Sequence, residues 1–234
     1  MMDYELSKDS IVMVLMNTGQ NKMALGDMPH RPFHDLSISY RLVVEKGPNR
    51  IASTIISWEL ANSMGMKEEE LYEVAVENTR RIFPPTVHSM LEAIMGMMEN
   101  GEQSEELEEI RRNETPIEQR MYVISNESRL HGAASMLYEE ELHKLAEKLE
   151  SSLYIMPSSI HEVIAISANI GRVDILTKMV KEVNASQVAF EEQLSNQVYL
   201  YNKDLRTLSP AMEDAASDHA WPIGRLQSKP TKQG

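Results

Sequence analysis

The sequence predicts an α+β protein with two lobes, each a small, mostly antiparallel sheet with packing helices. Three patterns support this prediction: a strictly alternating segment at residues 33–45, an amphipathic segment at 67–82, and a similar mixture of strand and helix patterns after residue 120. Only 10 Gly and 10 Pro occur in 234 residues, beside 17 Met. This composition favours helices and adaptable cores over a loop-rich sandwich.

The first lobe is expected to be built around a β-hairpin. A short apolar run at residues 10–16 has strand length, and the Pro-His-Arg-Pro sequence at 29–32 marks a break. Residues 33–45 then alternate, with Leu36 through Val44 apolar at every second position. Residues 47–50 supply turn chemistry, so residues 51–58 are predicted to return as an antiparallel partner.

Two helices are expected after the hairpin. Residues 67–82 place apolar side chains on one helical stripe, and the glutamates at 68–70 lie in the first turn, where the helix dipole favours anions. The Pro84-Pro85 pair ends this helix. Thr86 is then predicted to cap a second helix that runs to Met98.

The second lobe is expected to repeat this mixture of strands and packing helices. The predicted strands are residues 121–125, 153–156, 160–167 and 197–202, and the middle two form a hairpin around the turn at 157–159. One helix should end near Leu149 and bury Leu142, Leu145 and Ala146. A second helix, over 173–183, carries an apolar stripe of Val173, Leu176, Met179, Val180 and Val183.

Composition divides the chain into four parts. Residues 99–120 hold eight Glu and three Arg with few apolar residues, so we interpret them as a solvated acidic connector with a transient helix over 104–112. Hydrophobic periodicity also ends near residue 208. The predicted organisation is an N-terminal lobe over 1–98, the connector over 99–120, a C-terminal lobe over 121–207 and a flexible tail over 208–234.

Charge and cysteine content exclude several classes of function. The formal net charge is -13, which argues against a nucleic-acid binder because phosphate recognition needs clustered Lys and Arg. The absence of Cys excludes disulfides, thiolate metal sites and cysteine nucleophiles, and it fits a cytoplasmic location. No secretory signal and no apolar stretch long enough for a membrane span is present, so we expect no membrane association.

Three segments resemble a known family. They are residues 29–41, residues 68–79, and the sequence Leu-Tyr-Ile-Met-Pro-Ser-Ser-Ile-His-Glu-Val-Ile at 153–164 with its continuation at 179–184. The chain resembles an uncharacterised bacterial family found in gut anaerobes, domain of unknown function fifty-six eighty-eight, from about Ser10 to Asp204. The resemblance implies no established activity. It also implies an additional N-terminal region in other members, so this chain is expected to be a short form or a truncated one.

The best candidate site is the cluster of Ser158, Ser159, His161 and Glu162. A serine and a histidine two residues apart on a strand share a face, and the adjacent carboxylate could act as a base or bind metal. The alternative is structural, because Ser and Pro suit a hairpin turn. Asn126 and His131 lie between a strand and a helix, where loops often carry binding residues, although capping also explains them.

No complete catalytic, metal or cofactor motif is present in the sequence. His30 and His34 have helical ligand spacing, but Pro32 between them breaks the helix that such a pair would need. No glycine-rich phosphate loop occurs either. We therefore assign no catalytic residues, no metal and no cofactor.

The expected function is a non-enzymatic cytoplasmic module that binds a protein or a small ligand. Its candidate surface consists of Ser158, Ser159, His161, Glu162, Asn126 and His131. The alternative is a hydrolase of unfamiliar type that uses Ser158 or Ser159 with His161 and Glu162. A pocket that brings these side chains together with His131 or Asn126 would favour the enzyme, whereas a flat hairpin would favour the module.

Overall fold

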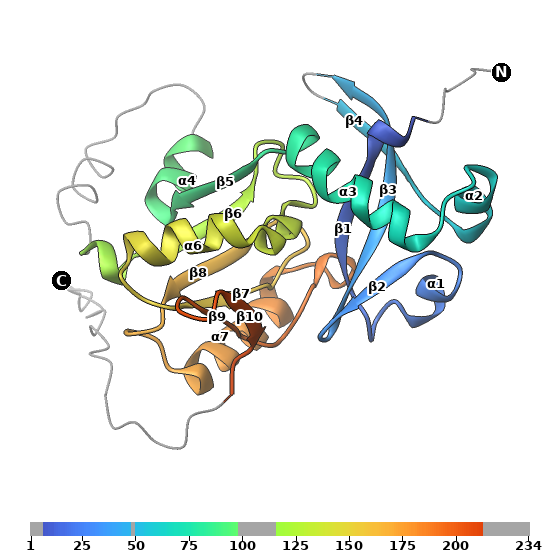
Figure 1. Cartoon of the computed structure of the whole chain (residues 1–234). Helices are drawn as coiled ribbons and strands as arrows, with labels where there is room; N and C mark the ends of the chain where they lie inside the picture. Colours follow the sequence, from blue (N-terminus) through green and yellow to red (C-terminus); the bar gives the residue numbers. More distant parts are fainter. Residues whose placement is uncertain (1–6, 48–49, 98–115, 213–234) are drawn as a thin grey trace, which may run out of the picture.

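The protein combines helices with two antiparallel sheets, which confirms the predicted α+β class (Figure 1). The structure is a computed structural model that describes residues 7–47, 50–97 and 116–212. Most of the predicted acidic connector, with its transient helix, lies outside these residues, and so does the tail from residue 213. The described end of the connector forms a short 3₁₀ helix, η2 (Ile117–Gln119).

The first sheet is built around one long central strand. Its strands are β1 (Ile11–Asn17), β2 (His30–Phe33), β3 (Leu36–Gly47) and β4 (Arg50–Ile55). Strand β1 pairs with one side of β3, while β2 and β4 pair with its other side, one after the other. The β3–β4 pairing is antiparallel from Arg41–Ile55 to Gly47–Arg50. This register confirms the predicted hairpin.

Two short elements of this lobe differ from the prediction. Residues 29–32 were expected to be a break and residue 33 the start of the long strand, yet residues 30–33 form the edge strand β2 and β3 begins at Leu36. Pro32 is compatible with an edge strand because no further strand needs its missing N–H. The predicted return strand ends at Ile55, and Trp58 instead opens helix α2 (Trp58–Ser63), where the Ser57 side chain accepts from the N–H of Leu60. A further short helix, α1 (Lys22–Gly26), precedes β2.

Helix α3 (Glu68–Ile82) forms as predicted and packs against β1. Thr79 on its buried face accepts a hydrogen bond of 2.8 Å from the backbone N–H of Met13. This bond satisfies a donor at the free edge of β1. The helix therefore covers both apolar surface and a sheet edge.

The predicted cap at Thr86 is wrong. Residues Pro85–Ser89 form strand β5, and the helix that follows, α4, spans Met90–Met97. Ser89 is the capping residue: its hydroxyl accepts from the N–H of Glu92 at 3.2 Å, and the Glu92 carboxylate accepts from the N–H of Ser89 at 2.6 Å. The β-branched Thr86 and Val87 instead pair with the neighbouring strand β6 (Tyr122–Asn126).

Replacing Ser89 by alanine is expected to lower the free energy of unfolding by about 1 kcal/mol, because it removes the acceptor from the first turn of α4. Urea unfolding measures this change. The control is Thr86→Val, which keeps the shape of the side chain and suits a strand, so it should be nearly neutral. A larger loss in Thr86→Val than in Ser89→Ala would restore the original cap assignment.

The second sheet has the strand order β10-β9-β7-β8-β6-β5. Its remaining strands are β7 (Leu153–Met156), β8 (Val163–Ser167), β9 (Tyr199–Asn202) and β10 (Thr207–Pro210). The predicted hairpin of β7 and β8 is confirmed, although β8 begins at Val163 and not at Ile160. Strand β10 was missed, and the predicted tail from residue 208 begins inside it.

The boundary predicted at residue 98 does not follow the sheets. Strand β5 and helix α4 precede this boundary, yet β5 is the edge strand of the second sheet. One hydrophobic cluster also contains residues from both sheets, including Leu36, Tyr40, Ile124 and Ile155. The two sheets therefore share one core.

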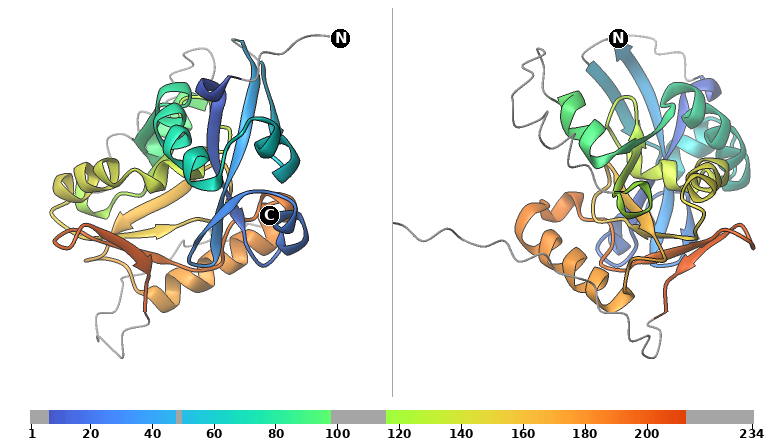
Figure 2. Two further views of the ribbon diagram at one scale, coloured as in Figure 1. Left: turned by 45° about the vertical axis from the view of Figure 1, so that its right-hand side comes forward. Right: turned by 90° about the vertical axis from the view of Figure 1, so that its left-hand side faces the viewer.

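Helices α6 (Glu139–Lys148) and α7 (Val173–Gln187) cover opposite faces of the second sheet (Figure 2). Alternate residues of β7 pack with α6 on one side and α7 on the other. The predicted α6 stripe is buried throughout. On α7 the prediction is wrong for Met179 and Val183, which are 43% and 38% exposed. The buried stripe of α7 is Val173, Leu176, Val180 and Asn184.

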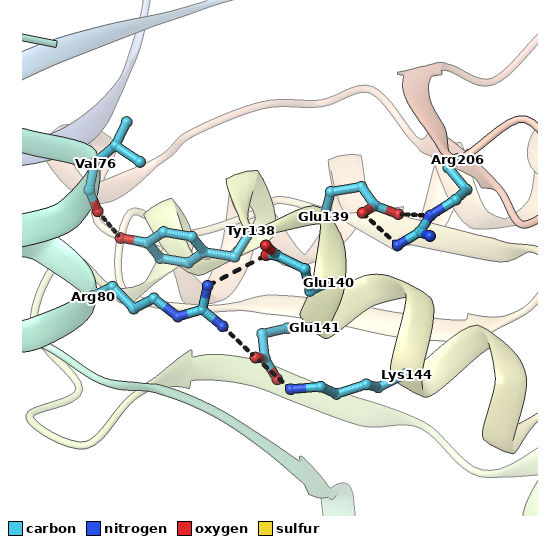
Figure 3. Close-up of polar contacts among 8 residues, drawn as sticks. All are labelled: Val76, Arg80, Tyr138, Glu139, Glu140, Glu141, Lys144 and Arg206. Atoms are coloured by element: carbon cyan, nitrogen blue, oxygen red, sulfur yellow. Dashed lines mark hydrogen bonds and ion pairs between the residues drawn. The ribbon is translucent and has the colours of Figure 1, made fainter. Parts of the chain in front are cut away.

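Polar contacts at the start of α6 connect the two halves of the molecule (Figure 3). Arg80 of α3 forms ion pairs with Glu140 and Glu141, while Arg206 of the β9–β10 hairpin binds both carboxylate oxygens of Glu139. The Tyr138 hydroxyl donates to the carbonyl oxygen of Val76 in α3. These contacts fix α6 between α3 and the hairpin.

A second polar connection lies at the β2–β3 turn. The Asp35 carboxylate accepts hydrogen bonds from the hydroxyls of Ser195 and Tyr199, and Phe33 stacks on the Tyr199 ring with the ring centroids 6.2 Å apart. The turn of the first sheet is therefore attached to the second. Within the described ranges, no helix has both the length and the apolar character that crossing a membrane requires.

Candidate functional site

The candidate site begins in the loop that follows β6. The side chain of Asn126, the last residue of β6, closes this loop by donating to the carbonyl oxygen of Leu130 at 2.9 Å. Arg129 and His131 both have left-handed backbone conformations, with φ of 51° and 52°. Such conformations cost about 1 kcal/mol or more in residues with a Cβ, and they concentrate at functional sites.

His161 reaches this loop from the β7–β8 connection. Its Nδ1 atom accepts from the backbone N–H of His131 at 3.4 Å, although the two residues are 30 positions apart. The imidazole centroids lie 5.9 Å apart at an interplanar angle of 31°. The two loops thus place one imidazole beside the other.

The backbone around His161 is held by two serines. The Ser159 hydroxyl accepts from the N–H of His161 at 3.1 Å, and the Ser125 hydroxyl donates to its carbonyl oxygen at 2.8 Å. Because Nδ1 is an acceptor, the proton of the neutral ring resides on Nε2. This nitrogen lies 3.4 Å from the Glu192 carboxylate, so both ring nitrogens of His161 have partners.

Arg41 of β3 carries a positive charge that acts on the His131 imidazole. Its Nε atom donates to the Ser53 hydroxyl at 2.9 Å and its Nη2 atom to the Ser53 carbonyl oxygen at 3.1 Å. Burial of the guanidinium lowers its pKa, but it stays protonated at neutral pH. A charge of the first sheet therefore acts on a histidine in a loop of the second.

Burial, and after it the charges of Arg41 and His161, lowers the pKa of His131 to about 4. The imidazole of His131 is consequently neutral at pH 7. Within the described residues, neither of its ring nitrogens has a hydrogen-bond partner. A neutral imidazole carries one donor and one acceptor, so both are available at this site.

The structure brings together part of the surface predicted from the sequence. Asn126, His131, Ser159 and His161 meet where the two loops join. Ser158 lies in the turn instead, with its carbonyl oxygen bound to the N–H of Leu194. Glu162 makes no hydrogen bond or ion pair with any other described residue.

Residues 157–162 lie outside the strands, apart from an isolated bridge between Ser159 and Gln193. The shared strand face expected for Ser159 and His161 is therefore absent here. The Ser159 hydroxyl contacts the backbone N–H of His161 and not its imidazole. The arrangement expected for a hydroxyl activated by a histidine base is not found in this cluster.

Sequence reasoning missed two residues whose charges act on the histidines, Arg41 and Glu192. Arg41 belongs to the polar face of the alternating strand, where it resembles any solvated residue. Glu192 lies 31 positions after His161 and is the last residue of a short 3₁₀ helix, η4 (Phe190–Glu192). The one sequence signal for Arg41 is a positive charge on a strand face whose other polar residues are Asp35, Ser37 and Ser39.

His30 and His34, the other histidine pair considered in the sequence, have different hydrogen-bond partners. His30 Nδ1 contacts the carbonyl oxygen of Met28, and His34 Nε2 contacts that of Leu208. Over residues 7–47, 50–97 and 116–212, no group of three or more His, Asp or Glu side chains is placed to hold a metal ion.

Comparisons with known proteins give one family and no individual relative. A family model described as "Family of unknown function (DUF5688)" matches residues 1–203. No curated protein and no solved structure matches the chain.

Proposed function

The chain belongs to the DUF5688 family, whose function is unknown, and we propose that it is a non-enzymatic module that binds a small ligand at the His131–His161 pair. The observation that carries this proposal is the meeting of the two imidazoles from separate loops, on a backbone that is left-handed at His131. Strain of this kind persists only where the surrounding structure enforces it.

Binding is favoured over hydrolysis by the hydrogen bonds of His161. A general base needs a free ring nitrogen directed at a nucleophile. Nδ1 of His161 accepts from a backbone N–H, and Nε2 faces Glu192. His131 has unpartnered ring nitrogens, but its low pKa makes it a weak base at neutral pH. The pair is therefore better suited to hold a ligand than to transfer protons.

The proposed location is the cytoplasm of a bacterial cell. The support is indirect: the chain has no Cys in 234 residues, which suits a reducing compartment. The net charge of -13 supports a partner other than nucleic acid.

The test is a titration of the protein with a set of small polar molecules, followed through the imidazole NMR signals. Compounds that bind should shift the signals of His131 and His161 at lower concentrations than they shift the signal of the exposed His88. In the variant His131→Asn, affinity should fall at least about tenfold, because one or more ligand hydrogen bonds are lost. Asparagine tolerates the left-handed backbone, so this variant should still fold.

The matched control is His88→Asn, which should bind as the unmodified protein does. Compounds that shift His88 while leaving His131 and His161 unchanged would refute the proposed site. Recovery of hydrolysed compounds, with loss of hydrolysis in Ser159→Ala, would instead establish the enzyme.

A further inference from the structure

We propose that His161 is a pH-dependent switch for the site: its neutral ring holds the loop that carries His131, and its protonated ring releases that loop. The proposal rests on the proposed function, because it concerns the regulation of the same site. It is carried by the two contacts of the His161 imidazole, one to the loop after β6 and one to η4, and by the left-handed backbone at His131.

The neutral imidazole of His161 connects two segments of the chain. Its Nδ1 atom accepts from the backbone N–H of His131 at 3.4 Å, and its Nε2 atom lies 3.4 Å from the Glu192 carboxylate in η4. A neutral imidazole has one acceptor and one donor, and these two contacts use one of each. The neutral ring therefore fits both neighbours at the same time.

Protonation of His161 is incompatible with the first of these contacts. A second proton can bind only at Nδ1, and both nitrogens of an imidazolium are donors. Nδ1–H would then face the N–H of His131, so two donors meet and the hydrogen bond is lost. The contact with Glu192 becomes stronger, because it changes into a pair of opposite charges. Protonation therefore weakens the link to the loop after β6 and strengthens the link to η4.

The charged and titratable groups around His161 come from three parts of the chain. Glu192 faces its Nε2 atom from η4, Glu162 follows it in the sequence, and the His131 ring centroid lies 5.9 Å from its own. Burial lowers the pKa of His131 to about 4, and the charges of Arg41 and His161 add to this effect. Acidification from about pH 8 to 5, where histidines usually change charge, therefore reaches His131 through His161 while the His131 ring stays neutral.

The loop after β6 has a conformation that depends on its contacts. The φ of His131 is 52°, and a left-handed residue with a Cβ costs about 1 kcal/mol or more. The side chain of Asn126 holds the loop before this residue, and after it the N–H of Ala133 donates to the carbonyl oxygen of Ile160 at 3.2 Å. Neither bond involves a titratable group. Loss of the His161 contact should therefore release mainly His131, and acidification should weaken ligand binding at its ring.

The experiment follows the full chain by NMR as the pH is lowered from about 8 to 5, so the probe is the proton itself. The backbone amide signal of His131 should shift with the same midpoint as the imidazole signals of His161. The hydrogen-exchange rate of this amide, corrected for the intrinsic rate at each pH, should rise about tenfold, as expected for the loss of one hydrogen bond. The amide of Ala133 is the internal control, because its acceptor is a backbone carbonyl oxygen.

Two variants separate the hydrogen-bond acceptor from its charge. His161→Asn keeps a side-chain acceptor that cannot be protonated, so the amide of His131 should keep its protection on acidification. Glu192→Gln removes the counter-charge of the imidazolium, so the midpoint of the His161 titration should fall by about 0.5 pH unit. The matched control is Glu191→Gln, an exposed position in the same short helix, which should leave the midpoint unchanged.

The inference is wrong if the amide of His131 does not follow the His161 titration, or if it loses protection equally in His161→Asn. A midpoint that rises in Glu192→Gln would also contradict it. If small polar molecules shift the imidazole signals at neutral pH but the His131 amide does not follow His161, the binding site stands and the switch fails. If the amide follows His161 and no compound binds, the switch stands and the proposed function fails.

Discussion

Replacing Gly132 by alanine is expected to lower the free energy of unfolding by about 3 kcal/mol. A Cβ atom at this position would lie 2.2 Å from the Ser125 hydroxyl, 2.4 Å from the carbonyl oxygen of His161 and 2.9 Å from the backbone nitrogen of Asn126. Two of these atoms are backbone, and the Ser125 hydroxyl is itself bonded to that carbonyl. No side-chain rotation relieves all three contacts. Urea unfolding measures the loss, and the m value is expected to stay the same as in the unmodified protein.

The matched control is Gly26→Ala, because a Cβ at Gly26 would meet nothing within 4 Å. Its stability should stay within about 0.5 kcal/mol of the unmodified protein. Gly132→Ala should also move the two loops apart, so the imidazole signals of His131 and His161 should change even below the unfolding transition. Equal stability of the two variants would mean that the loops are not packed as the structure places them.

Elements with a long hydrophobic period were predictable from the sequence. The alternating segment at 33–45 and the helical stripe at 67–82 each contain enough repeats to define one face, and the structure contains both as β3 and α3. The missed strands β2, β5 and β10 have only four or five residues. Each of these segments becomes a strand because it pairs with a neighbouring strand, and its local sequence does not indicate which strand that is.

Ser89 illustrates why helix boundaries were harder to predict. Thr86 and Ser89 are both capable N-cap residues, and both precede the apolar residues of α4. Sequence preference alone does not separate them. The pairing of Thr86 with Ser125 in the sheet decides the matter, because a residue in a strand ladder is not available to begin a helix.

The candidate site could be predicted only in part. Asn126 and His131 were indicated by their position between a predicted strand and a predicted helix, and His161 by its place next to two serines at the start of a predicted strand. Their meeting depends on the order β8-β6 in the sheet, which places the two loops at one end of neighbouring strands. The charge of Arg41, which belongs to the other sheet, acts on His131 only in the folded protein, so no local sequence pattern indicates it.

Glu68, at the start of α3, is the centre of a second polar cluster and is itself partly buried. Its carboxylate accepts two hydrogen bonds from Arg31, at 3.1 and 2.9 Å, and one from the Tyr40 hydroxyl. Tyr40 is fully buried, and Arg31 lies over the Tyr72 ring at 3.8 Å. The cluster ties helix α3 to strands β2 and β3 of the first sheet.

Replacing Glu68 by alanine is expected to lower the free energy of unfolding by about 3 kcal/mol at pH 7. The variant leaves the buried Tyr40 hydroxyl without its acceptor and the partly buried Arg31 without its counter-charge. The loss at Tyr40 is costly because its hydroxyl is shielded from water. Urea unfolding measures the change. Glu69→Ala is the matched control, since Glu69 lies in the same helical turn but is exposed. A loss of similar size in Glu69→Ala would assign the effect to the helix dipole.

The effect of Glu68→Ala should also depend on pH. Burial acts to raise the pKa of the Glu68 carboxyl, but the hydrogen bonds from Arg31 and Tyr40 outweigh it, so the pKa lies below its usual value of 4.5. A carboxyl with a lowered pKa stabilises the folded state above that usual value, and this contribution is lost as the pH falls through the folded pKa. Unfolding at pH 7 and pH 3 should therefore show a smaller difference between variant and unmodified protein at pH 3. A residual difference should remain, because a protonated Glu68 still offers Tyr40 an acceptor. A difference that stays constant over this range would show that the charge of Glu68 contributes nothing.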